Sequence, residues 1–191
     1  MNVLEELQGR RTVTLTSGIN EKQAGDLRHR LLELDLASGQ EILLLIDSDG
    51  GYAHPAFSVY DMISSLRSPV TGIVVGQCYS MATVILQACG KRMALENATF
   101  FLHFINSELE FSHRLPKKKI RALFERRYRE GRDSQRKAER VIAARAGRPA
   151  KEIRKLMRAG DELQARFCAD EAKKIGLIDG IIENPRGLFA Q

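Results

Sequence analysis

The chain has 191 residues, of which 43% are hydrophobic and 28% are charged, and its formal net charge is +6. This composition is close to that of globular proteins and excludes wholesale disorder. No apolar stretch approaches the ~20 residues that a membrane span needs, and the acidic N-terminus lacks the pattern of a signal peptide. We therefore expect a cytoplasmic protein with no membrane partner.

Strand and helix patterns alternate along the chain, which predicts the α/β class. Apolar or alternating runs predict strands at 11–15, 41–46, 70–75, 92–95, 99–104 and 177–182. Helical periodicity predicts helices at 20–36, 56–66, 81–88, 115–145 (weakened near Gly131), 149–157 and 169–175. No repeat or linker divides the chain, so we predict one domain over residues 1–191, from which the helix at 115–145 projects.

The positive charge is concentrated in residues 114–158, which hold 18 Lys and Arg against 5 Asp and Glu and so carry +13, leaving −7 for the rest. A basic block of this size can bind nucleic acid. Its only aromatic residues are Phe124 and Tyr128, and no nucleic-acid module surrounds it. We favour a long helix with a solvated basic face, which could meet an acidic surface of a sister subunit.

The cysteines and histidines indicate no cofactor. Cys78, Cys89 and Cys168 are odd in number and lack metal-ligand spacing, so we expect buried free thiols. The four histidines are scattered singly, which predicts no metal site.

Ser80 lies between a strand expected to end at Gly76 and a nearly uncharged helix that starts at Met81. A serine at this position ordinarily caps the helix by accepting a bond from its free amides. The same position suits a nucleophile, since those amides and the positive helix end stabilise negative charge on an oxygen.

Two other positions at strand ends complete a possible site. Gly50 follows the 41–46 strand and can bring a second amide close to a substrate, or can simply form a turn. His103 lies near the end of the 99–104 strand, where an imidazole is usually packed in the core but can also take a proton from a serine hydroxyl.

The combination resembles the Clp protease proteolytic subunit family, which has a crotonase-type fold. The resemblance rests on IDSDGGYAHPAFSVYDMI (46–63), GQCYSMATVILQACGKRMALENATFFLHF (76–104) and ADEAKKIGLIDGI (169–181). It covers roughly residues 11–104 and 147–182. It implies a spiral of β-β-α units with a protruding helical handle, here the basic segment 115–145.

The resemblance also implies roles for individual residues. Ser80 would be the nucleophile, His103 the general base, and the backbone amides of Gly50 and Met81 the oxyanion hole. The residues after the oxyanion glycine, Gly51 and Tyr52, would pair with an extended peptide or unfolded protein substrate. The implied assembly is a homo-oligomer of heptameric rings, single or stacked, that enclose a chamber, or a mixed ring with a related subunit.

Three departures from the family pattern bear on activity. The third catalytic residue, an aspartate in the family, aligns with Gln164 without gaps or with Asp161 after a small insertion. Asp49 stands where the family usually has proline, and its carboxylate would oppose a developing negative charge if it pointed inward. Only about ten residues precede the first predicted strand, which makes docking of a ring ATPase doubtful.

We therefore predict a serine endopeptidase of the Clp type that acts through an acyl-enzyme. One alternative is a catalytically impaired scaffold or regulatory subunit, which Gln164 and the short N-terminal segment favour. Another is a crotonase-like enzyme acting on acyl-CoA, which would give the Ser80–His103 pair no role. Nucleic acid is not the expected partner.

Overall fold

The computed structural model describes residues 11–106, 114–158 and 164–184. In these residues seven strands form one sheet in the order β1-β2-β3-β4-β7, with β5 pairing to β3 and β6 pairing to β5. All pairs are parallel except β5–β6, which is antiparallel. The strands are β1 (Thr12–Thr16), β2 (Ile42–Ser48), β3 (Val70–Tyr79), β4 (Lys91–Leu95), β5 (Thr99–His103), β6 (Gln164–Cys168) and β7 (Gly180–Ile182). The predicted α/β class is confirmed.

The central strand β3 pairs with two different strands along one of its edges. Its first half, Thr71 to Val74, lies beside β4, and its last residues, Gln77 to Tyr79, lie beside β5. The prediction that this strand ends at Gly76 was wrong, since β3 continues to Tyr79. The continuation results from pairing with β5 and, after a register shift, with Ser48 of β2. Asp47 adds one bond, since its Oδ1 accepts the Gln77 N–H at 3.0 Å.

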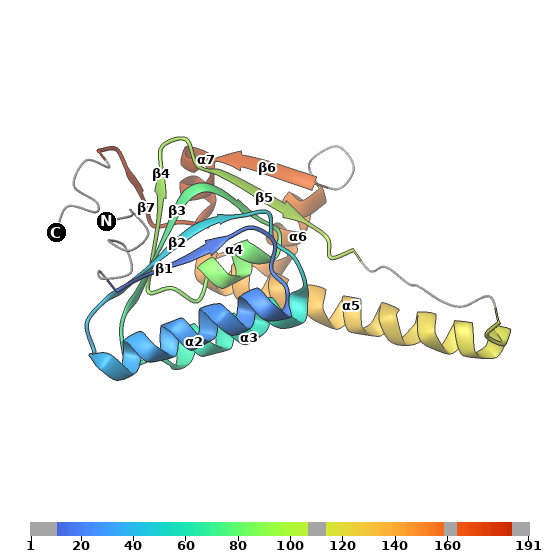
Figure 1. Cartoon of the computed structure of the whole chain (residues 1–191). Helices are drawn as coiled ribbons and strands as arrows, with labels where there is room; N and C mark the ends of the chain where they lie inside the picture. Colours follow the sequence, from blue (N-terminus) through green and yellow to red (C-terminus); the bar gives the residue numbers. More distant parts are fainter. Residues whose placement is uncertain (1–10, 107–113, 159–163, 185–191) are drawn as a thin grey trace.

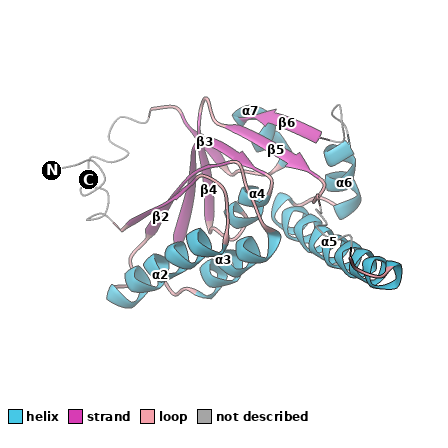
Figure 2. Cartoon of the chain, turned by 45° about the vertical axis from the view of Figure 1, so that its right-hand side comes forward, coloured by secondary structure: helices cyan, strands magenta, loops and turns pink. Residues whose placement is uncertain are grey.

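The helices are α2 (Glu21–Ala37), α3 (Ala53–Ser65), α4 (Met81–Leu86), α5 (Lys117–Ala146), α6 (Ala150–Arg158) and α7 (Ala169–Ile175). Helices α2 and α3 lie side by side along one face of the sheet (Figure 2). Asn20 caps α2 as expected, since its side chain accepts the Gln23 N–H at 3.0 Å. Helix α3 begins three residues before the predicted start, and α7 has the predicted bounds.

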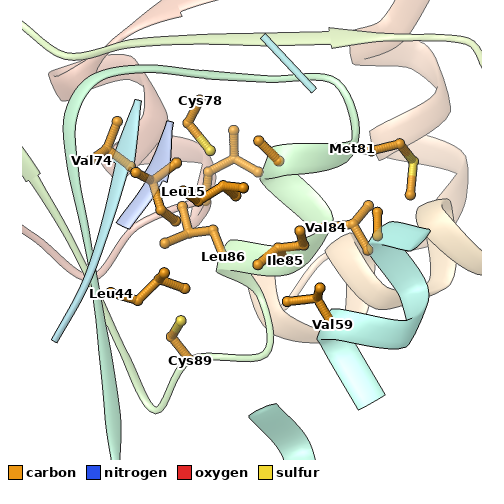
Figure 3. Close-up of a cluster of buried hydrophobic side chains, with 14 of the residues drawn as sticks. Leu15, Leu44, Val59, Val74, Cys78, Met81, Val84, Ile85, Leu86 and Cys89 are labelled. Atoms are coloured by element: carbon orange, nitrogen blue, oxygen red, sulfur yellow. The ribbon is translucent and has the colours of Figure 1, made fainter. Parts of the chain in front are cut away.

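Helix α4 is the centre of the hydrophobic core. All six of its residues are buried, which explains why this segment carries no charge. Figure 3 shows Val84, Ile85 and Leu86 among side chains of the strands and of α3, including Leu44, Val74 and Val59. Met81 is packed in this core, so it fixes the position of the chain immediately after Ser80, where α4 begins.

Helix α5 leaves the sheet and projects beyond the rest of the described chain (Figure 1). It runs without interruption through Gly131, where we predicted a weak point. Its buried residues, Ala138, Glu139, Ile142 and Ala143, all lie in its C-terminal third. The helical projection predicted from the basic segment 115–145 is therefore present, and the segment before Ala138 packs no residue into the core.

Strand β6 was not predicted from the sequence. Its five residues, QARFC, alternate poorly and follow a segment without a clear pattern. The strand forms because it pairs antiparallel with β5, with His103 opposite Gln164 and Phe101 opposite Arg166. This pairing places Gln164 beside the candidate base.

Candidate active site

Ser80 has a backbone conformation that a non-glycine residue seldom adopts, with φ 51° and ψ −123°. Such conformations cost about 1–3 kcal/mol and persist only where the surroundings impose them. Here the Ser80 N–H donates to the Phe101 carbonyl at 2.8 Å, and the Ser80 carbonyl accepts the Thr83 N–H and hydroxyl at 3.1 and 2.6 Å. The sharp turn between strand and helix resembles the exposed elbow that carries the nucleophilic serine of α/β-hydrolases.

The Ser80 side chain makes no capping bond to α4. Its Oγ lies instead 2.7 Å from Nε2 of His103. The pairing of β3 with β5 produces this contact: Tyr79 is the register partner of Phe101, and the Ser80 amide extends the ladder by bonding the Phe101 carbonyl. His103 follows two residues later on the same face of β5.

The imidazole of His103 is held in a stack of rings. The Phe101 ring lies 5.2 Å from it at an interplanar angle of 27°, and Tyr79 meets Phe101 edge-on at 5.5 Å. The Arg166 guanidinium lies 4.9 Å from the centre of the Phe101 ring on β5. Phe101 had no predicted role, although its i, i+2 spacing from His103 would have indicated a shared face.

Gly50 lies against the junction that carries Ser80. A Cβ added to Gly50 would come within 2.6 Å of the Tyr79 carbonyl oxygen, 2.6 Å of Ser80 Cβ and 3.0 Å of the Met81 amide nitrogen. Its φ of 92° also disfavours any side chain. The Met81 amide is the first of α4 and has no acceptor within the helix. The two amides that the sequence singled out therefore lie close to each other and to Ser80.

The Gly50 amide has a partner in this structure, the Oγ of Ser48 at 3.2 Å. The Ser48 hydroxyl in turn donates to the Ser17 carbonyl at 2.6 Å. Ser48 is fully buried and was not among the predicted site residues, although it stands two positions before Gly50. An oxyanion that binds the Gly50 amide must share this bond or replace it.

Gly51 and Tyr52 differ in what they offer to a substrate strand. The Tyr52 N–H donates to the Ile19 carbonyl at 2.9 Å, and the Gly50 carbonyl accepts the Ile19 N–H at 2.6 Å. Since backbone groups alternate in direction along a strand, Gly51 directs its own N–H and carbonyl away from Ile19. Only Gly51 of the two has a backbone edge available for pairing, and the Tyr52 side chain is 72% exposed.

Of the two candidates for the third catalytic residue, only Gln164 lies within the described residues. Gln164 is the direct cross-strand partner of His103 in the backbone register of β5 and β6. Asp161 lies outside the described residues. Asp49 is exposed, and its carboxylate lies on the side of Gly18.

A cluster of polar side chains from α5 and α6 lies next to the site. Gln135 accepts the Ile105 N–H on Oε1 at 2.8 Å and donates from Nε2 to Glu139 at 3.0 Å. Glu139 is 2% exposed and accepts bonds from the Arg154 guanidinium on both carboxylate oxygens. Burial alone would raise the pKa of Glu139, but the bonds from Arg154 and Gln135 outweigh it and hold that pKa below its ordinary value. No sequence signal indicated this group beyond the i, i+4 spacing of Gln135 and Glu139.

The cysteines do not supply an alternative nucleophile among the described residues. Burial raises the pKa of the Cys78 thiol above its ordinary value and that of Cys89 to about 12, so both stay protonated. Cys168 is exposed, so the prediction that all three thiols are buried was wrong for this residue.

In the described part of the chain no three His, Cys, Asp or Glu side chains gather as metal ligands, and no helix is long and apolar enough to cross a membrane.

A serine hydroxyl bonded to an imidazole, with main-chain amides close by, is an arrangement that hydrolytic enzymes use for acyl transfer. The chain belongs to the Clp protease family, a family of peptidases, whose model matches residues 1–185. It is 31% identical over 186 residues to the ATP-dependent Clp protease proteolytic subunit 2 of Frankia casuarinae, covering 96% of this chain and 80% of that protein. It is 30% identical over 175 residues to subunit 1 of Chlamydia caviae, covering 90% and 86% of the two chains.

The fold agrees with a solved structure of the same family. A mutant of ClpP1 from Listeria monocytogenes superposes with a TM-score of 0.79 and 26% sequence identity. The match covers 98% of this chain and 99% of that one. The predicted family membership and the ClpP-like architecture with its long helix are confirmed.

Proposed function

We propose that this chain is a serine endopeptidase of the Clp type, which cleaves peptides or unfolded proteins inside an oligomeric chamber. The observation that carries the proposal is the 2.7 Å contact between Ser80 Oγ and His103 Nε2. A serine that only capped α4 would direct its hydroxyl to the helix amides, and Ser80 makes no such bond.

The reaction follows from this contact. His103 Nε2 takes the Ser80 hydroxyl proton while Oγ attacks the carbonyl carbon of the scissile bond, and the carbonyl oxygen becomes an oxyanion. The amides of Gly50 and Met81 donate to that oxygen. The imidazolium then gives its proton to the leaving amine, which departs and leaves an acyl ester on Ser80. A water molecule, deprotonated by His103, releases the acyl group and restores the hydroxyl.

The substrate backbone is expected to pair with Gly51. Its N–H and carbonyl face away from Ile19, so an extended peptide can add to this edge as a strand. Main-chain pairing holds a peptide without selecting its side chains. This accounts for cleavage of unfolded chains of varied sequence.

The chamber requires several copies of the chain. We expect heptameric rings, single or stacked, of this chain alone or mixed with a related subunit. The projecting helix α5 supports this, because its basic surface lies outside the packed core, where an acidic surface of a neighbouring subunit can meet it. The curated relatives are named as ATP-dependent proteases, but we propose no ATPase partner here.

Labelling by a fluorophosphonate probe tests the nucleophile directly. We expect mass spectrometry of the modified protein to locate one adduct on Ser80, because the probe reacts only with a serine that an adjacent base activates. The Ser80→Ala variant is the control and should remain unlabelled. An unlabelled wild-type protein, with trypsin labelled in parallel, would contradict the proposal.

The position of Gln164 favours a second candidate, a subunit whose catalysis is impaired. A glutamine opposite His103 can orient the imidazole through its carbonyl oxygen but supplies no charge to stabilise imidazolium. Such a subunit would serve in a mixed ring as a scaffold or regulator, with little activity of its own.

Replacing Gln164 by Asp distinguishes these candidates. We expect Gln164→Asp to raise kcat for a fluorogenic peptide by at least about tenfold, since loss of the corresponding charge in a serine protease costs up to ~10⁴-fold. Gln164→Asn is the control, because it matches Asp in size without its charge. If Asp161→Asn abolishes activity while Gln164→Asp has no effect, the third residue is Asp161 instead.

A further inference from the structure

Gln135 and Ile105 separate two cavities of very different size. The first holds about 10 Å³ and is lined by Ser80, His103 and core residues such as Ala138 and Met157. The second is an open groove of about 440 Å³ along α5, lined with Phe104, Phe124 and Tyr128. Gln135 and Ile105 line both cavities and so form the wall between them.

The small cavity admits only a small group. A volume of about 10 Å³ is roughly the space of one water molecule, and a methyl group is of similar size. The groove has the volume of a ligand pocket, and its aromatic residues suit a large apolar side chain.

Two hydrogen bonds fix the orientation of the Gln135 carboxamide. The Ile105 N–H can only donate, so the oxygen of Gln135 must face it; the Glu139 carboxylate can only accept, so the nitrogen must face that side. Rotation of the amide by 180° would break both bonds. The wall is therefore held in one position.

Glu139 is itself held in place. Its carboxylate is buried and binds the Arg154 guanidinium through both oxygens. A buried carboxylate whose charge is paired in this way does not leave its site readily, because the unpaired charge would be costly. The series Arg154, Glu139, Gln135 thus links α6 and α5 to the chain just after His103.

We propose that Gln135 determines the size of the substrate side chain that the site accepts next to the scissile bond. With Gln135 bonded to Ile105, the cavity beside Ser80 accepts glycine, alanine or serine. Without this wall, the cavity joins the aromatic groove and a large apolar residue fits. The inference rests on the proposed peptidase function of the Ser80–His103 pair.

Two peptidyl phosphonate probes test the proposal, one with an alanine side chain and one with phenylalanine at the reacting residue. We expect the wild-type protein to react faster with the alanine probe. In Gln135→Ala and in Ile105→Ala, which opens the wall from the other side, the ratio of phenylalanine to alanine labelling rates should rise by about tenfold or more. Gln135→Met fills a similar volume but lacks the hydrogen bonds that hold the wall in position, so its ratio should lie between those of the wild type and Gln135→Ala.

Hydrogen exchange gives a readout that is independent of activity. Gln135→Met should speed the exchange of amides in residues 104–106, because the Ile105 N–H loses its acceptor. Faster wild-type labelling by the phenylalanine probe, or an unchanged ratio in folded Gln135→Ala and Ile105→Ala, would overturn the role of Gln135 alone. A wild-type protein that neither probe labels would overturn the peptidase function and the role of Gln135 with it.

Discussion

Replacing Ser80 by Ala is expected to lower kcat/KM for peptide hydrolysis by at least about 10³-fold, to the level that binding and the main-chain amides alone provide. The reason is that the alcohol oxygen forms the acyl-enzyme, and no other described side chain lies at the position of Ser80 Oγ beside His103. A fluorogenic peptide assay of the purified oligomer measures the loss. Near-ultraviolet circular dichroism checks that the variant has kept its packing.

A double variant tests whether Ser80 and His103 act together. His103→Ala alone should cost about as much as Ser80→Ala, and the combined variant should cost little more than either, because the base has no function without its nucleophile. If the two losses multiply, the two side chains contribute independently. The 2.7 Å contact would then be structural only.

Replacing Gly50 by Ala is expected to lower kcat by about 10²-fold, the typical cost of losing one oxyanion donor. The added Cβ would meet the Tyr79 carbonyl oxygen and Ser80 Cβ at 2.6 Å, in a backbone with φ 92°. These are backbone and nearby rigid atoms, so the loop itself must move, and the Gly50 amide moves with it. KM should change less than kcat, since the amide acts mainly on the transition state.

Gly18→Ala is the matched control for Gly50→Ala. Gly18 lies on the neighbouring loop, and its added Cβ would meet only ordinary contacts at 3.7 Å, from Asp49 and the Gly50 carbonyl. We expect its kcat and urea midpoint to stay close to those of the wild type. A Gly50→Ala variant with wild-type kcat would show that this amide does not bind the oxyanion.

The sequence predicted most elements of the fold because their patterns are local. The helix at 169–175 and the buried strand near 41–46 follow from periodicity, and Asn20 follows from capping chemistry. Strand β6 was missed because its formation depends on pairing with β5, a long-range contact with no trace in QARFC. The extension of β3 to Tyr79 was missed for a similar reason, since the residues that pair with it lie on β5 and β2.

The candidate site shows the same division between local and long-range information. The position of Ser80 was clear, but local reasoning favoured capping over catalysis, and only its distance from His103 separates the two roles. The family resemblance, not periodicity, brought the two residues together in advance. Gln135 lies on a helix that the sequence assigned to a projection, so nothing connected it with the site before its bond to Ile105 was seen.

The pairing of β3 with β5 bears on whether a free subunit, outside any ring, is already able to react. The serine and the imidazole belong to neighbouring strands of one subunit, and the spacing between paired strands sets the distance between them. Ring assembly therefore has no need to unite the two groups. If free subunits prove inert and rings active, the switch must act on entry of the peptide, on the Gly50 amide that Ser48 holds, or on the third catalytic residue, and an isolated subunit should still react with a small phosphonylating agent.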